Sequence, residues 1–114
     1  MKYIFSQEEI KKKQFDDRWV RFAFGPQGLK ESEGLNLGIV NFSKNRTALN
    51  HRHHVEEALF VLAGSAQIKI NGKNYPIKKN DFIYVPRETD HQVITSGSCI
   101  KILFVFGGEI IIEH

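Results

Sequence analysis

Three histidines and two glutamates fall within seven residues of this chain, in the segment HRHHVEE at positions 51–57. Imidazole and carboxylate groups are common ligands of transition-metal ions, so this segment could form part of a metal site. The alternative is a polar loop whose histidines face water, and for an isolated His-x-His pair that alternative is favoured. The choice depends on which side chains share a face and on what the rest of the chain supplies.

Alternation of side chains along an extended strand places His51 and His53 on the same face. Their backbone positions are then roughly 7 Å apart, which lets both rings converge on one ion. Glu57 has the same parity, but it can join them only if the chain reverses between His53 and Glu57. The same parity turns His54 and Glu56 away from the site. Because a bend at this point loosens the argument, His54 stays an alternative ligand.

A second segment, DFIYVPRETDHQV at 81–93, ends an apolar strand at Pro86, makes a turn and opens the next strand with His91. Together the two segments resemble the cupin superfamily, a family of jelly-roll β-barrels. His51, His53, Glu57 and Gly64 have the spacing of the first cupin motif, and Asp81 to Pro86 with His91 fit the second. The resemblance covers about residues 35–106. It implies that a divalent metal is bound by four residues: His51, His53, Glu57 and His91.

The chain departs from the cupin motifs at four positions. Asn45 and Asn80 stand where the two motifs begin with glycine, and asparagine tolerates a left-handed backbone better than most residues. Glu88 replaces the turn glycine, at a cost of about 1 kcal/mol if its φ is positive. Thr95 replaces the closing asparagine. None of these substitutions removes a ligand.

Three imidazoles and a carboxylate accept Mn, Fe, Co, Ni, Cu or Zn. An octahedral ion with four protein ligands keeps two positions for water or substrate, which permits Lewis-acid chemistry. The resemblance implies two functional classes. One is a metal-dependent enzyme acting on a small sugar or organic acid by isomerase, lyase or dioxygenase chemistry. The other is a non-catalytic protein that binds a small ligand or keeps the metal for structure. Tyr84 and Glu56 are the candidates for a general acid or base.

The pocket walls should come from inward residues of the predicted strands, namely Leu49, Leu59, Val61, Val93 and one of the aromatics Phe82 and Tyr84. In the strand that begins at Glu57, the expected inward set is Glu57, Leu59, Val61 and Ala63, and Gly64 should end that strand. Arg21 beside Trp19 could pair with an anionic substrate, although a strand arginine that faces solvent is the favoured interpretation.

Short strands separated by turn signals must position these residues. Ser6 and Glu9 have the form of a capping box, which predicts a short helix through about Gln14. Asn71-Gly72 predicts a type I′ hairpin turn. The expected strands are 19–24, 35–42, 47–53, 57–64, 66–70, 73–78, 81–86, 91–95, 99–106 and a short piece at 110–112. This pattern predicts one all-β domain over 1–114, an antiparallel jelly-roll β-barrel with a short N-terminal helix.

Composition narrows the class of protein further. The 114 residues carry a net charge of +3, and the one basic run, at 11–13, lies beside acidic residues. This argues against a nucleic-acid partner. The apolar run at 102–106 is too short to span a membrane. A single cysteine, Cys99, excludes an internal disulfide and fits a cytoplasmic protein. The segment CIKILFVF at 99–106 is apolar on both faces after Lys101, and 110–112 adds more apolar surface. Together with the cupin resemblance, which implies dimers, this predicts a homodimer. The other expected partner is a small-molecule ligand or substrate.

Overall fold

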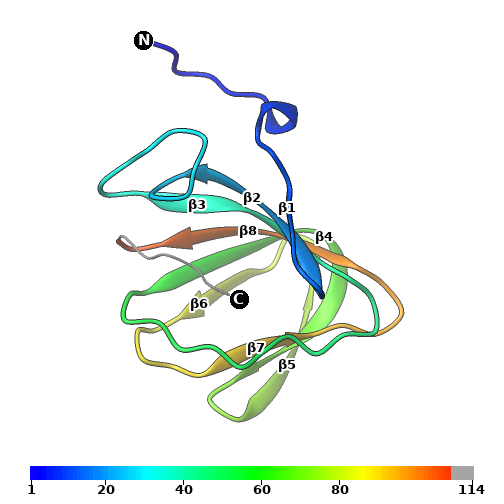
Figure 1. The fold of residues 1–114 in the computed structure, drawn as a ribbon. Coiled ribbons are helices and arrows are strands. Elements are labelled where there is room, and N and C mark those ends of the chain that lie inside the picture. Colours follow the sequence, from blue (N-terminus) through cyan, green and yellow to red (C-terminus); the bar gives the residue numbers. More distant parts are fainter. Residues whose placement is uncertain (109–114) are drawn as a thin grey trace.

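The computed structural model describes residues 1–108, and its eight named strands pair in antiparallel fashion (Figure 1). One 3-10 helix precedes them. In chain order the elements are η1 (Gln7–Glu9), β1 (Lys13–Gln14), β2 (Arg18–Phe24), β3 (Asn36–Phe42), β4 (Glu57–Ile70), β5 (Lys73–Lys78), β6 (Phe82–Val85), β7 (His91–Ile94) and β8 (Ile100–Phe106). The all-β prediction is confirmed. The arrangement is consistent with a jelly roll, although the hydrogen-bonded network of the described residues does not close into a ring.

Strand β4 connects two sheets. Its first half, 57–64, lies between β8 and β6, in a sheet that continues through β3 and β2 to β1. Its second half, 65–70, lies between β5 and β7. The prediction that Gly64 ends this strand is therefore wrong. Gly64 has φ +85°, and a Cβ there would lie 2.1 Å from the carbonyl oxygen of Cys99, so it permits the close crossing from one sheet to the other.

The core lies between the inner faces of the two sheets. Buried side chains alternate along β2, β3 and β8, as expected for strands with one apolar face. In β4 the alternation runs through Glu57, Leu59 and Val61 and stops at Ala63, which is exposed. The ladder with β8 shifts register between Val61 and Ala63, which explains why the predicted inward position of Ala63 is wrong.

Two predicted elements are shorter in the structure. Both hydrogen bonds of the Ser6–Glu9 capping box form, but the helix ends at Glu9 instead of continuing to Gln14. Lys13 and Gln14 pair with β2 instead. The predicted strand at 47–53 is reduced to two isolated bridges, Thr47 with Ile94 and His51 with His91. The predicted piece at 110–112 lies outside the described residues.

The turn predictions are confirmed where backbone angles test them. Asn71 and Gly72 have φ values of 50° and 82°, both positive as a type I′ turn requires. Asn45, Asn80 and Glu88 also have positive φ, at 57°, 77° and 57°. All three therefore adopt the left-handed backbone of the glycines they replace. None of the helical residues in the described part of the chain forms a segment with the length and hydrophobicity of a membrane span.

Candidate metal centre

Three predicted ligands meet at one end of the space between the sheets. Glu57 is the first residue of β4, His91 is the first residue of β7, and His53 lies in the loop before β4. One nitrogen of each ring and one oxygen of the carboxylate all lie within 4.8 Å of one another. Glu57 and His91 are buried and His53 is half-buried. The required turn after His53 occurs as a bend at 54–55.

The fourth predicted ligand, His51, lines the same cavity but lies slightly apart from this group. Its ring centroid is 5.9 Å from that of His53 and 6.3 Å from that of His91. Its backbone pairs with His91 through two hydrogen bonds of 2.8 and 2.9 Å. The exposed His54 is not part of the group, as the parity argument predicted.

The loop that carries His53 is fixed by a turn on the neighbouring segment. The backbone N–H of Glu88 donates to the carbonyl oxygen of His53 at 2.6 Å. Glu88 makes this contact with φ +57°, in the turn between Pro86 and His91 where the cupin motif has glycine. The second motif therefore supplies one candidate ligand, His91, and also holds a candidate ligand of the first motif, His53, in place.

The geometry of His91 selects one arrangement of its ring proton. Nδ1 lies 3.0 Å from the carbonyl oxygen of Thr89, which can only accept, so Nδ1 carries the hydrogen. In the neutral ring Nε2 is then an acceptor, and it lies 3.0 Å from Oε1 of Glu57, which is also an acceptor. Among the described residues, no hydrogen bond of adequate geometry reaches this buried oxygen. Two buried acceptors this close need a proton or a cation between them.

The pKa values of His53 and His91 are shifted in opposite directions. Burial lowers the pKa of His53, and the neighbouring His91 and His54 lower it further against the opposing effect of Glu57. Burial also acts to lower the pKa of His91, but the Glu57 carboxylate and the Thr89 carbonyl outweigh it, so that the pKa of His91 is raised. A neutral His53 has a lone pair available for an ion.

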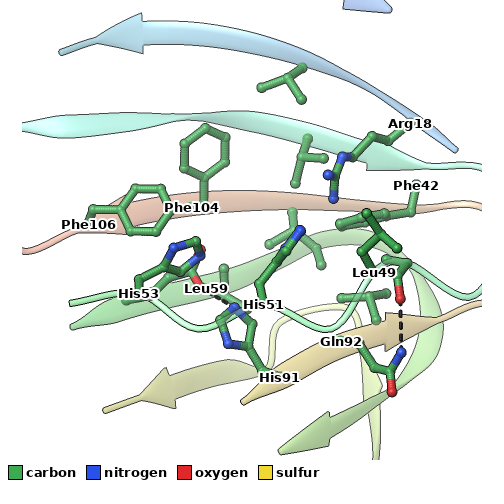
Figure 2. A pocket seen from close by; sticks show the side chains of 16 residues that line it. Arg18, Phe42, Leu49, His51, His53, Leu59, His91, Gln92, Phe104 and Phe106 are labelled. Atoms are coloured by element: carbon green, nitrogen blue, oxygen red, sulfur yellow. Dashed lines mark hydrogen bonds and ion pairs between the residues drawn. The ribbon is translucent and has the colours of Figure 1, made fainter. Parts of the chain in front are cut away.

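The ligand group opens on a small cavity of about 70 Å³ (Figure 2). Its walls are mostly apolar, formed by Val20, Val40, Phe42, Ala48, Leu49, Leu59, Val93, Ile102, Phe104 and Phe106. Besides the four predicted ligands, Arg18 and Gln92 are the polar side chains in its lining. Gln92 donates to the carbonyl oxygen of Ala48 at 2.9 Å. Leu49 is 67% exposed, so it marks the mouth of the cavity.

Some predicted wall residues are correct and others are not. Leu49, Leu59 and Val93 line the cavity as expected. Val61 is fully buried in the core but is not part of this lining. The prediction of an aromatic wall from Phe82 or Tyr84 is wrong, because inward positions on β6 belong to Ile83 and Val85.

The two acid or base candidates lie on the outer surface. Tyr84 and Glu56 are both exposed, and the Tyr84 hydroxyl donates to the Glu56 carboxylate. Neither residue lines the cavity. Outward alternation places Tyr84 opposite the inward Ile83 and Val85, so it cannot contact a molecule held inside.

Sequence reasoning missed Arg18. The arginine named as a possible partner of an anionic substrate was Arg21. This residue is half-buried, and its side chain donates to the backbone carbonyl of Gln7 at 2.8 Å, outside the cavity. The predicted strand began at Trp19, one residue too late. Arg18 has the parity of the buried Val20 and Phe22, so a strand beginning at Arg18 would have pointed it inward.

The fold and the group formed by His53, Glu57 and His91 are those of a cupin-type scaffold, and the chain belongs to the cupin family. Residues 38–106 match the Cupin_2 family model, described as a cupin domain. Uncharacterized protein MJ1618 of Methanocaldococcus jannaschii is 33% identical over 78 residues, which are 68% of this chain. The present chain spans 60% of the length of that relative.

Solved structures share the fold at low identity. DMSP lyase DddQ from Ruegeria pomeroyi has a TM-score of 0.82 at 19% identity, over 93% of this chain and 60% of that chain. Ectoine synthase from P. lautus has a TM-score of 0.81 at 17% identity, over 96% of this chain and 80% of that chain. At these identities the likeness shows the fold alone.

Proposed function

We propose that this chain binds one divalent transition-metal ion through His51, His53, Glu57 and His91. The close pair of acceptors, His91 Nε2 and Glu57 Oε1 at 3.0 Å, is the main support for the proposal. Two ligand atoms at right angles on an ion with bonds of roughly 2.1 Å lie roughly 3 Å apart. A cation between them removes the repulsion of two buried acceptors. His51 would complete the set by a rotation of its side chain.

The donor set suits Mn, Fe, Co, Ni, Cu or Zn. Such an ion supplies Lewis-acid activation of a bound oxygen atom and lowers the pKa of a bound water. The chain's own residues hold the ligands in position. The Thr89 carbonyl fixes the proton of His91 on Nδ1, and the Glu88 N–H anchors the loop of His53. Partners of this kind orient metal-bound histidines and keep the coordinating nitrogen free.

We further propose that the site acts on a small organic molecule held in the apolar cavity, as an isomerase, lyase or dioxygenase would. The cavity opens beside Leu49 and leads directly to the histidine group. Two structures that share the fold are a lyase and a synthase, and these activities are those of the relatives. Sugars and organic acids are the candidate substrates. A homodimer and a cytoplasmic location are further predictions from the sequence.

A second candidate function is binding of a small ligand without turnover. One observation favours it: among the described residues that line the cavity, the ligands and Arg18 are the ionisable groups. Tyr84 and Glu56 are outside. Proton transfer would therefore have to involve a metal-bound water or a ligand. Proton NMR of candidate compounds incubated with the metal-loaded protein distinguishes the two, because only an enzyme changes their spectra over time.

Metal content of the purified protein tests the site itself. The chain is purified without a metal-affinity step and compared with His53→Ala and Glu57→Gln by elemental analysis. We expect about one ion per chain in wild type, and less than a tenth of that in both variants. His54→Ala is the matched control, since it removes an adjacent but exposed histidine and should retain the metal. A metal-free wild type, or equal retention in His53→Ala, contradicts the proposal.

A further inference from the structure

Arg18 places a positive charge in the wall of the cavity. It is only 5% exposed, although it lies at the start of β2, and its side chain lines the same space as the histidine group. Burial of a charged side chain among apolar residues costs several kcal/mol in general. An arginine remains protonated even so, because its pKa is so far above neutrality. The protein therefore maintains a permanent cation inside a mostly apolar cavity.

The local contacts of Arg18 orient its guanidinium. The guanidinium carbon Cζ of Arg18 lies 5.3 Å from the ring centroid of Phe42 and 5.8 Å from that of Phe15, within the range of cation–π attraction. Asp17 lies 3.6 Å away, measured from Oδ1 to the Arg18 Nε. Burial lowers the pKa of Arg18, and the charges of Asp17 and Glu57 counteract this. Glu57 is therefore close enough for its charge to affect Arg18.

Arg18 and the histidine group lie at different ends of the cavity. Figure 2 shows Arg18 beside Phe42 on one side, and His53 beside Phe106 on the other. In this view His51 lies between them, and the apolar part of the wall includes Leu59 and Phe104. A molecule lying along this wall would meet a guanidinium at one end and the metal centre at the other.

The size and charge of the space limit what can lie there. An apolar cavity of about 150 Å³ admits benzene, whereas this one has about 70 Å³. The enclosed part of a ligand is therefore small. With neutral histidines, a divalent ion, Arg18 and Glu57 leave a net charge of about +2, which favours an anion. A guanidinium matches a carboxylate in a two-point hydrogen-bonded pair.

We propose that Arg18 binds the carboxylate of a small hydroxy- or keto-acid whose second oxygen reaches the metal centre. This rests on the proposed metal site and selects organic acids over sugars as the ligand class. The acid spans the cavity, with its short carbon chain against the apolar wall. Arg18 is then a specificity-determining residue, distinct from the metal ligands.

Titration calorimetry with glycolate, and with its uncharged counterpart glycolamide, tests the proposal. In the metal-loaded protein we expect Arg18→Met to weaken glycolate binding at least tenfold, leaving glycolamide binding and metal content unchanged. Arg18→Lys should give an intermediate loss, because it keeps the charge but not the planar fork. Arg21→Met is the matched control, an arginine of the same strand outside the cavity, and should bind glycolate as wild type does. In wild type, the Arg18 Nε–H NMR signal should shift with glycolate and not with glycolamide, a measurement that needs no variant to fold.

The outcomes separate this inference from the proposed metal function. If wild type binds no metal but binds glycolate in an Arg18-dependent way, the metal proposal fails and the carboxylate site stands. If metal binds and glycolate affinity is equal in wild type and Arg18→Met, the carboxylate site fails alone. Absence of millimolar glycolate binding to wild type also overturns it. Arg18-dependent binding of inorganic phosphate without binding of glycolate would overturn the choice of a carboxylate.

Discussion

Glu88 is a non-glycine residue in a left-handed conformation, and its replacement by glycine should stabilise the protein. Its φ of +57° brings the side-chain carbon close to the following carbonyl, at a cost of roughly 1–2 kcal/mol for a residue other than glycine. Glycine removes that cost but loses roughly 0.5–1 kcal/mol through the greater freedom of the unfolded chain. Taking the middle of each range, the expected net gain is about 0.5–1 kcal/mol. For a chain of 114 residues this corresponds to a rise in Tm of roughly 2–6 °C.

Thermal and urea unfolding followed by circular dichroism measure this gain on metal-free protein. Glu88→Ala is the control, because alanine removes the carboxylate but keeps the unfavourable backbone. The glycine variant should exceed the alanine variant by about the same 0.5–1 kcal/mol. Equal stabilities of Glu88→Gly and Glu88→Ala would refute the strain argument. Metal content should be unchanged in Glu88→Gly, since the backbone N–H that holds the His53 carbonyl is retained.

Three further predictions concern other parts of the molecule. Gly64→Ala should destabilise the fold by at least about 3 kcal/mol in urea unfolding, because it combines positive φ with a backbone clash at Cys99. The control is Gly97→Ala, where a Cβ has open space, and it should change the free energy of unfolding by less than about 0.5 kcal/mol. The hydrogen bond to Glu56 raises the pKa of Tyr84 above its usual value, so the pair stabilises the fold at pH values below the unfolded pKa and loses this effect as pH rises through the folded pKa. Glu56→Gln should lower the Tyr84 pKa measured by NMR titration, and an unchanged pKa would contradict the contact. The exposed Phe82 and Tyr84 form an apolar outer face beside the half-buried Phe60. Light scattering at micromolar concentration should therefore give the mass of a dimer, and Phe82→Glu should shift this mass towards that of the monomer. A monomeric wild type would contradict this prediction.

The candidate metal ligands could be located in the sequence because their signals are local. Parity fixed the common face of His51 and His53, and the motif spacing located Glu57 and His91. The structure brings His53, Glu57 and His91 together. The predicted strand that carries His51 did not form: among the described residues, this segment pairs with β7 through two isolated bridges and no continuous ladder. His51 still lies near the other candidate ligands, because its backbone hydrogen bonds to His91 hold this segment in place without a regular strand.

The predictions that are wrong concern the ends of strands and helices, where contacts with other parts of the chain override the local sequence signal. The predicted strand starts one residue late and so leaves out Arg18, which shares the buried face of β2 with Val20 and Phe22, whereas Arg21 lies on the other face. The capping box correctly located a helix start, but the pairing of Lys13–Gln14 with β2 ended that helix early. Gly64 was interpreted as the end of a strand because glycine usually breaks strands locally. Only the neighbouring β8 shows that the same glycine allows β4 to pass through.

The position of the proposed metal centre relates ion binding to the arrangement of the two sheets. Glu57 belongs to the part of β4 that pairs with β6 and β8, whereas His91 belongs to β7, which pairs with the other half of β4. The two ligands therefore lie in different sheets, and β4 is the strand that connects those sheets. An ion held by both residues would form a second link between the sheets, at the end where Leu49 marks the opening. Because the ion binds the folded arrangement and not the separated strands, its affinity adds to the stability of the mouth of the cavity. The buried acceptors of Glu57 and His91, unfavourable without a proton or a cation between them, are thus consistent with a site that gives up some stability of the metal-free fold in order to bind an ion.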